Sequence, residues 1–157
     1  MDIYGEIQRK GRKISDDFNG LPSNLDAAVT TKDGTTYFFK GDQYYQARGR
    51  SIESGPKPIN SHFKNVPNDL DAAFVYTKDD LIYFVKGDKF IRYDTEGHEM
   101  TENERMRSGF NFNFYQKLKA AFSSNRGNIL FFPWFYFKLY EKGFVQAQND
   151  IYEILQC

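Results

Sequence analysis

The residues of this chain best suited to chemistry are two histidines, His62 and His98, and one cysteine, Cys157. The run HEMTE at 98–102 begins like the zinc-protease signature, in which two imidazoles one helical turn apart hold the metal and a glutamate acts as base. Its fifth position is Glu102, where that chemistry needs a second histidine. We therefore interpret 98–102 as solvated residues of a turn and an outer strand.

A nucleophilic triad is poorly supported for the same reason. His62 falls in a predicted helical turn beside Phe63, where we expect a partly exposed structural histidine. Cys157 has no histidine near it in the sequence, and nothing indicates a lowered thiol pKa. It is either an inert terminal thiol or half of a disulfide whose partner is missing from this sequence. We assign no catalytic residue, and a hydrolase is disfavoured.

Charge and hydropathy exclude two classes of partner. Lysine plus arginine and aspartate plus glutamate number 21 each, so the net charge is zero and the basic surface that nucleic acid needs is missing. No apolar run is long enough to span a bilayer. The first residues, MDIYGE, carry no apolar leader, so either the chain is not exported by that route or a leader is absent from this sequence.

Two further runs have a ligand interpretation and a structural one. The tripeptide KGD occurs at 40–42 and 86–88, each time between two strand-like patterns, which indicates a tight turn rather than an anion or metal site. The basic cluster RKGRK at 9–13 could bind polyanions such as glycosaminoglycans. A charged surface loop is the alternative.

The elements that position these residues come in repeated units. The motif LDAA followed by an aromatic strand occurs twice, and a third, eroded copy begins LKAA. Asp26 and Asp71 are 45 residues apart, and Asp71 and Lys119 are 48 apart. A repeat of this length indicates propeller blades or a solenoid. The paired segments of the three copies are 25–29 with 36–45, 70–74 with 82–93, and 118–122 with 130–140.

Each repeat is predicted to hold four antiparallel strands followed by a helical turn. β-Branched and aromatic residues mark the strands, and glycine-containing turns separate them. Four strands per repeat are typical of a propeller blade. In the first repeat, the expected strands are 26–31, 35–40, 43–47 and a short, ragged 51–53, with Pro56 and Pro58 after them.

The helical turns follow from a matched spacing of apolar residues. Ile14 and Phe18 are four residues apart, as are Ile59 and Phe63, so each pair shares one face of a helical turn. In the second repeat, 102–108 is polar and charged, which indicates a helix or a loop. The third repeat has Pro133 in place of the glycine turn, and proline belongs in a turn or at a sheet edge.

The combination LDAA(V/F), then YFFKGDxYY, then a proline and a short helix, resembles the hemopexin-like repeats of hemopexin, vitronectin and the C-terminal domains of matrix metalloproteinases. The resemblance runs through the chain and is weakest in the third repeat. The ending YEILQC at 152–157 is similar to the end of such a domain of the gelatinase kind. In that family Cys157 would close the ring by a disulfide to the first blade.

The resemblance implies an all-β fold of hemopexin-like β-propeller blades, namely three four-stranded antiparallel blades in an incomplete four-bladed ring with short connecting helices. We expect one domain over 1–157. The chain is then an incomplete natural or engineered one, or copies associate to cover the open blade edge. The expected divisions are 1–24 as the trailing end of a preceding blade, and 25–69, 70–117 and 118–157 as the blades.

The resemblance also implies an ion site in the central channel. The backbone carbonyls of Asp26, Asp71 and Lys119 would hold calcium or sodium. The backbone amides two residues on would hold chloride, and no catalytic metal is expected. Lys119 brings a positive side chain to this set. The alternative is that small residues merely let the strands pack near the axis. The amide positions are Ala28, Ala73 and Ala121.

The function implied by the resemblance is non-catalytic recognition of protein partners, either matrix proteins or protease inhibitors, by a secreted protein. Trp134, Phe135 and Tyr136 are the expected partner-binding patch, and blade core is the alternative, above all for Tyr136. The competing function is a storage or defence protein that binds a small ligand or ion such as heme, a polyamine or calcium. Heme binding needs an axial histidine or tyrosine in a pocket.

Overall fold

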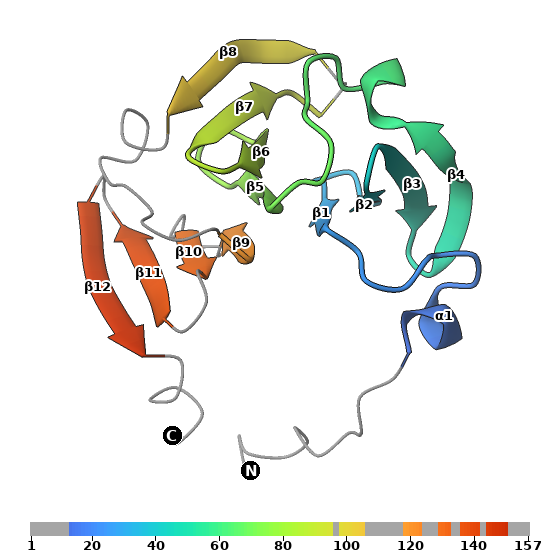
Figure 1. The fold of residues 1–157 in the computed structure, drawn as a ribbon, viewed down its shortest axis with the longest axis horizontal. Helices are drawn as coiled ribbons and strands as arrows, with labels where there is room; N and C mark the ends of the chain where they lie inside the picture. Colours follow the sequence, from blue (N-terminus) through green and yellow to red (C-terminus); the bar gives the residue numbers. More distant parts are fainter. Residues whose placement is uncertain are drawn as a thin grey trace.

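The structure is a computed structural model that describes residues 13–95, 98–105, 118–123, 129–132, 136–141 and 144–150. The described strands form three four-stranded antiparallel sheets, which follow one another around a common axis (Figure 1). They lie along an arc and do not form a closed ring. The first blade holds β1 (Ala27–Thr30), β2 (Thr35–Lys40), β3 (Gln43–Arg48) and β4 (Ser51–Pro58). The second holds β5 (Ala72–Tyr76), β6 (Leu81–Lys86), β7 (Lys89–Tyr93) and β8 (Glu99–Arg105), and the third holds β9 (Ala120–Ser123), β10 (Ile129–Phe132), β11 (Tyr136–Glu141) and β12 (Phe144–Asp150).

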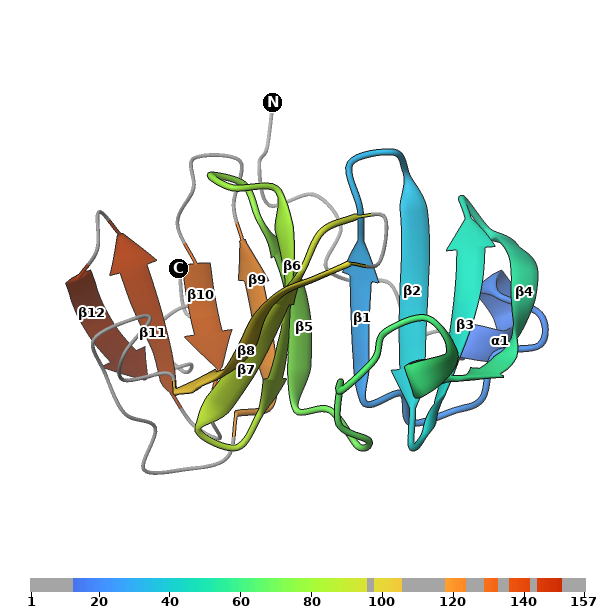
Figure 2. The same cartoon turned by 90° about the horizontal axis from the view of Figure 1, so that it is seen from above.

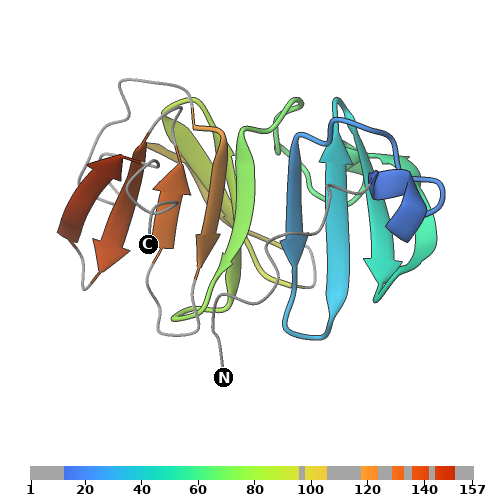
Figure 3. The ribbon, with the colours of Figure 1, turned by 90° about the horizontal axis from the view of Figure 1, so that it is seen from below.

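The predicted all-β blade architecture is confirmed. Each blade begins at the axis with a short alanine-containing strand, and β1, β5 and β9 lie side by side in both side views (Figures 2 and 3). The strand registers are equivalent, because Ala27, Ala72 and Ala120 lie opposite Phe39, Val85 and Phe132. Glycines with positive φ, Gly41 at 60° and Gly87 at 61°, make the turns between the second and third strands.

The predicted helical turns are also present. α1 (Ile14–Asp17) precedes the first blade, and η1 (Ile59–Ser61), a 3₁₀ turn, follows β4. In each turn the phenylalanine amide, of Phe18 or Phe63, donates to the isoleucine carbonyl four residues earlier over 2.8 Å. The spacing of four between isoleucine and phenylalanine is therefore that of a helical turn in both places.

Two expectations about the outer strands are wrong. β4 runs from Ser51 to Pro58 and includes both prolines, where a ragged strand at 51–53 was expected. An outermost strand needs donors on one side only, so it tolerates proline, and register shifts opposite Tyr44, Gln46 and Ala47 accommodate the irregularity. Residues 102–105 lie in β8 rather than in a helix or loop. Among the described strands, β8 pairs with β7 alone, and its position at the sheet edge permits a charged sequence.

Most of the described core lies between the blades, because alternate residues of β6, a central strand of the second blade, face the first and the third blade. Tyr37 and Phe39 of β2 pack with Ile82 and Phe84 of β6, together with Phe63 from the connecting segment. The other face of β6 packs against the third blade in the same way, where Val85 and Tyr83 join a cluster with Ile129 and Phe131. Burying each large apolar side chain contributes about 1.5–3 kcal/mol, which ties the separate sheets into one body.

Candidate functional site

The inner ends of the three blades surround a narrow cavity of about 210 Å³. Its lining residues immediately precede the inner strands in each blade, so equivalent positions of the three repeats meet there. The structure therefore brings together the three predicted cation positions. The lining residues are Leu25, Asp26, Leu70, Asp71, Leu118 and Lys119. We call this cavity the narrow mouth.

The two aspartates of the narrow mouth hold turns within their own blades. Asp26 Oδ2 accepts a hydrogen bond from the Gly41 amide at 2.6 Å, and Asp71 Oδ2 accepts one from the Gly87 amide at 2.7 Å. Lys40 Nζ also donates to Asp26 Oδ1 at 3.0 Å. Burial opposes ionisation of Asp26, but the Gly41 and Lys40 hydrogen bonds outweigh it and lower its pKa.

This pairing explains a feature of the repeats that the sequence reasoning missed. The Asp of LDAA and the Gly of KGD are hydrogen-bond partners in the first two blades. The third repeat lacks both, because Lys119 stands for the aspartate and the glycine turn is replaced by a run containing Pro133. The joint loss of two residues far apart in the sequence was a usable signal for their contact.

The three positions of the narrow mouth have equivalent backbone geometry. The amides of Asp26, Asp71 and Lys119 donate to the carbonyls of Phe39, Val85 and Phe132 at 2.9, 3.0 and 2.8 Å. Their convergence suits an oxygen-ligated ion, but the two carboxylates are engaged with glycine amides and Lys119 is positively charged. Binding of calcium or sodium, with chloride, stays a prediction.

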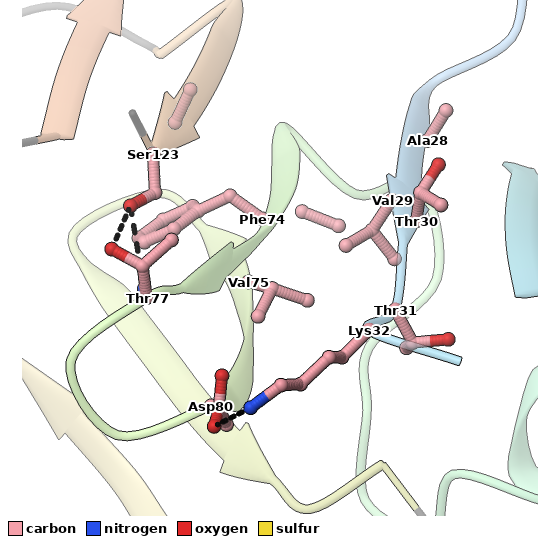
Figure 4. Close-up of a pocket in the computed structure, with 12 residues that line it drawn as sticks. Ala28, Val29, Thr30, Thr31, Lys32, Phe74, Val75, Thr77, Asp80 and Ser123 are labelled. Carbon is pink, nitrogen blue, oxygen red and sulfur yellow. Dashed lines mark hydrogen bonds and ion pairs between the residues drawn. The ribbon is translucent and has the colours of Figure 1, made fainter. Parts of the chain in front are cut away.

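A second cavity of about 530 Å³ lies farther along the same three inner strands and contains the predicted anion positions Ala28, Ala73 and Ala121. Figure 4 shows its rim, where Lys32 reaches from the β1–β2 turn to Asp80 of the second blade, with 3.0 Å between Nζ and Oδ2. We call this cavity the wide mouth. Its size is that of a small-molecule site.

Polar contacts between neighbouring blades border the wide mouth. Besides the Lys32–Asp80 pair, the hydroxyls of Thr77 and Ser123 lie 3.4 Å apart and link the second blade to the third (Figure 4). Asp33 shapes the turn that carries Lys32, because its carboxylate accepts hydrogen bonds from the hydroxyls of Thr31 and Thr35. The same hydrogen bonds hold the pKa of Asp33 far below its usual value. The sequence predicts this turn, but the contact of Lys32 with the next blade is visible only in the structure.

The histidines lie in different places and do not form a site together. His62 stacks on the rings of Tyr37 and Tyr44, with both centroid distances 6.1 Å. Burial, and then the charge of Lys57, lowers the His62 pKa. His98 lies just before β8, as expected for a turn and an outer strand, with its Nδ1 2.9 Å from Asp94 Oδ2. Within the described ranges, no three His, Cys, Asp or Glu side chains gather as a metal site.

Several predicted residues fall outside the described part of the chain. They are Trp134, Phe135, Cys157 and all of the basic cluster except Lys13. Tyr136 is the first residue of β11, but its side chain is not among those described. The partner-binding patch and the disulfide stay predictions. Across the described residues there is no helix with the length and apolarity to cross a bilayer.

Comparison with known proteins agrees with this geometry. The Hemopexin family profile matches residues 25–68. Matrix metalloproteinase-20 of Homo sapiens is 32% identical over 126 residues, which cover 76% of this chain and 25% of that protein. Vitronectin of Oryctolagus cuniculus is 35% identical over 89 residues, which cover 52% of this chain and 19% of that protein. The chain thus spans a quarter or less of the length of these relatives.

Solved structures share the fold. Hemopexin fold protein CP4 from cow pea superposes with a TM-score of 0.77 at 21% identity, covering 90% of this chain and 76% of that one. A 2S albumin seed protein from Dolichos superposes with a TM-score of 0.74 at 24% identity, covering 89% of this chain and 76% of that one. A Cicer arietinum albumin showing hemagglutination superposes with a TM-score of 0.71 at 21% identity, covering 82% of this chain and 68% of that one.

The repeated blades, their common axis and these similarities define a class: the protein is built of propeller blades of the hemopexin fold. Residues 25–68 match the Hemopexin family, and the chain resembles regions of matrix metalloproteinase-20 and vitronectin.

Proposed function

We propose that this protein is a non-catalytic, secreted recognition module that binds protein partners, either matrix proteins or protease inhibitors. The observation that carries the proposal is the similarity to matrix metalloproteinase-20, which extends over 126 residues and covers 76% of this chain. The described residues also lack a cluster suited to metal chemistry, and the two histidines lie apart.

The arrangement of the blades suits recognition. The second sheet buries both faces of its central strands against the neighbouring blades, and each sheet has its outermost strand, β4, β8 or β12, at the periphery (Figure 1). The connecting turns and outer strands can therefore vary in sequence and contact partners, while the buried cores maintain the arrangement of the blades.

The test is a binding assay with purified chain on immobilised collagen, fibronectin and tissue inhibitors of metalloproteinases. We expect saturable binding to at least one of these proteins, reduced about tenfold or more in the double variant Trp134→Ala with Phe135→Ala, because aromatic residues dominate interface energies. The matched control is Lys64→Ala with Lys89→Ala, which removes two exposed side chains elsewhere. Absence of binding to every panel member would count against the proposal.

A second function is favoured by the wide mouth. Its volume of about 530 Å³ and its mixed lining suit a small ligand, which fits a storage or defence protein. The likeness to an albumin showing hemagglutination agrees with such a function. Thermal unfolding in the presence of hemin, spermine or calcium tests it. A ligand-specific rise in Tm that Lys32→Ala abolishes would support this candidate, and no rise with any of them would exclude it.

A further inference from the structure

The chain contains one Asn-Gly pair and one Asp-Gly pair, and the structure places them in different surroundings. The side chain of an asparagine or aspartate can be attacked by the next backbone nitrogen, most readily before glycine, which has no Cβ to crowd that nitrogen. The pairs are Asn19–Gly20, in the turn after α1, and Asp33–Gly34, in the turn between β1 and β2. All four residues are exposed, so access to solvent does not distinguish the two pairs.

Hydrogen bonds restrain the Asp-Gly pair. The Gly34 amide donates to the Thr31 carbonyl at 2.9 Å. The Asp33 carboxylate accepts hydrogen bonds from the hydroxyls of Thr31 and Thr35 at 2.5 and 2.7 Å. Both groups that would have to react are therefore engaged, and cyclisation at this pair requires that these hydrogen bonds break first.

The Asn-Gly pair has no such restraint in the part of the chain that the structure describes. There, neither the Gly20 amide nor the Asn19 side chain has a hydrogen-bond partner. Gly20 has a φ of +97°, and a Cβ added to it would meet no described atom within 4 Å apart from its chain neighbours. The nitrogen that follows Asn19 is therefore exposed, without a described partner and in open space.

We propose that Asn19 is a site of spontaneous deamidation driven by the Gly20 backbone nitrogen. This nitrogen forms a bond to Cγ of Asn19, its proton leaves with the side-chain amino group as ammonia, and a succinimide ring results. One water molecule then opens the ring. Breaking the new Cγ–N bond gives aspartate, whereas breaking the original peptide bond gives isoaspartate, whose main chain runs through Cβ and Cγ and is one carbon longer.

The longer main chain of isoaspartate acts on the segment that precedes the first blade. Phe18 packs on Phe38 with 5.1 Å between ring centroids, and Leu21 belongs to the same buried cluster. The Leu21 amide also donates to the Phe18 carbonyl at 3.3 Å, so these two residues enclose the reactive turn. An extra backbone carbon between them changes the turn and loosens residues 14–21 from the blade. This effect does not depend on the protein recognition proposed above.

The first experiment incubates the purified 157-residue chain at neutral and at alkaline pH and follows each asparagine by peptide mapping with mass spectrometry. Asn19 should convert at least about tenfold faster than Asn60, an exposed asparagine of η1, because the Cβ of Ser61 crowds the attacking nitrogen there. The rate should rise with pH, since the nitrogen must lose its proton. Gly20→Ala should slow the conversion. Equal rates at Asn19 and Asn60 would overturn the proposal.

The same peptide maps test the contrast between the two pairs. Asp33 should form isoaspartate in urea-unfolded chain and at least about tenfold more slowly in folded chain, because its hydrogen bonds hold both reacting groups. Asn19 should convert at similar rates in both states. Strong protection of Asn19 by folding would show that its turn is not open to the reaction and would overturn the proposal.

The second experiment compares the isoaspartyl form, separated by chromatography, with Asn19→Asp, which carries the same charge without the extra carbon. The Phe18 amide should exchange its hydrogen at least about tenfold faster in the isoaspartyl form than in Asn19→Asp, whereas the Phe63 amide should be unchanged. Equal exchange of the Phe18 amide in the two proteins would overturn the proposed loosening of residues 14–21.

Discussion

Two connecting segments of this chain have the same apolar pattern in different surroundings. Residues 14–25 precede the first blade, and residues 59–70 connect the first blade to the second. Both contain an isoleucine and a phenylalanine one helical turn apart, joined by the same 2.8 Å backbone hydrogen bond. Yet Ile59 and Phe63 are 1% and 0% exposed, whereas Ile14 is 37% exposed and Phe18 is half-buried.

The difference comes from the number of sheets that each segment touches. Phe63 contacts the Tyr37 ring of the first blade and the Phe84 and Tyr93 rings of the second, at centroid distances of 5.3, 4.9 and 5.6 Å. Phe18 packs on Phe38 of the first blade at 5.1 Å, in a cluster whose described members all precede β5. Equal sequence patterns therefore make unequal contributions to stability.

The largest expected effect comes from truncating the two phenylalanines. Phe63→Ala should lower the free energy of unfolding by about 3–5 kcal/mol, because it removes a fully buried ring between two sheets. Phe18→Ala should cost about 1 kcal/mol, since its ring has one sheet beneath it. Urea denaturation of both variants and the wild type measures the difference. Equal losses of unfolding free energy in the two variants would contradict this expectation.

A smaller difference is expected in hydrogen exchange of the two matched amides. The Phe18 and Phe63 amides have the same acceptor spacing and the same 2.8 Å distance, so local geometry does not distinguish them. We expect the Phe63 amide to exchange at least roughly 30-fold more slowly, because it opens only when the two blades separate. Exchange followed by NMR tests this. Similar protection factors would show that both segments open together.

The smallest expected effect is a pH dependence confined to the second segment. Burial and the Lys57 charge lower the pKa of His62 in the folded state, so the unfolded chain binds more protons just below its own pKa of about 6.5. The contribution of neutral His62 is then complete above that pKa and declines as pH falls below it. His62→Gln should flatten the dependence of the urea midpoint on pH there. An unchanged slope would contradict this assignment.

The fold was largely predictable from the sequence because its strongest signals are local or periodic. The aromatic runs of β2 and β6, the glycine turns at Gly41 and Gly87 and the two isoleucine–phenylalanine pairs each specify a short element. The outer strands were less predictable. β8 is charged and β4 contains prolines, because a strand at a sheet edge is constrained by one neighbour and by solvent.

The site was predictable only in part. The repeat register placed Asp26, Asp71 and Lys119 at equivalent positions, and the structure gathers them around one cavity. The engagement of both aspartates with glycine turns and the Lys32–Asp80 pair were not anticipated. These contacts join residues 15, 16 and 48 positions apart, so no local pattern reports them.

By itself, the amino-acid sequence determined the repeat, the strand order within each blade and the resemblance to hemopexin-like repeats, since these depend on residue types and spacing along the chain. Only the tertiary structure decided which of two matching segments is buried, and that a lysine shares the narrow mouth with two aspartates. Burial and electrostatic balance are set by all neighbours in space, and in the core clusters and the narrow mouth these neighbours include residues of other blades.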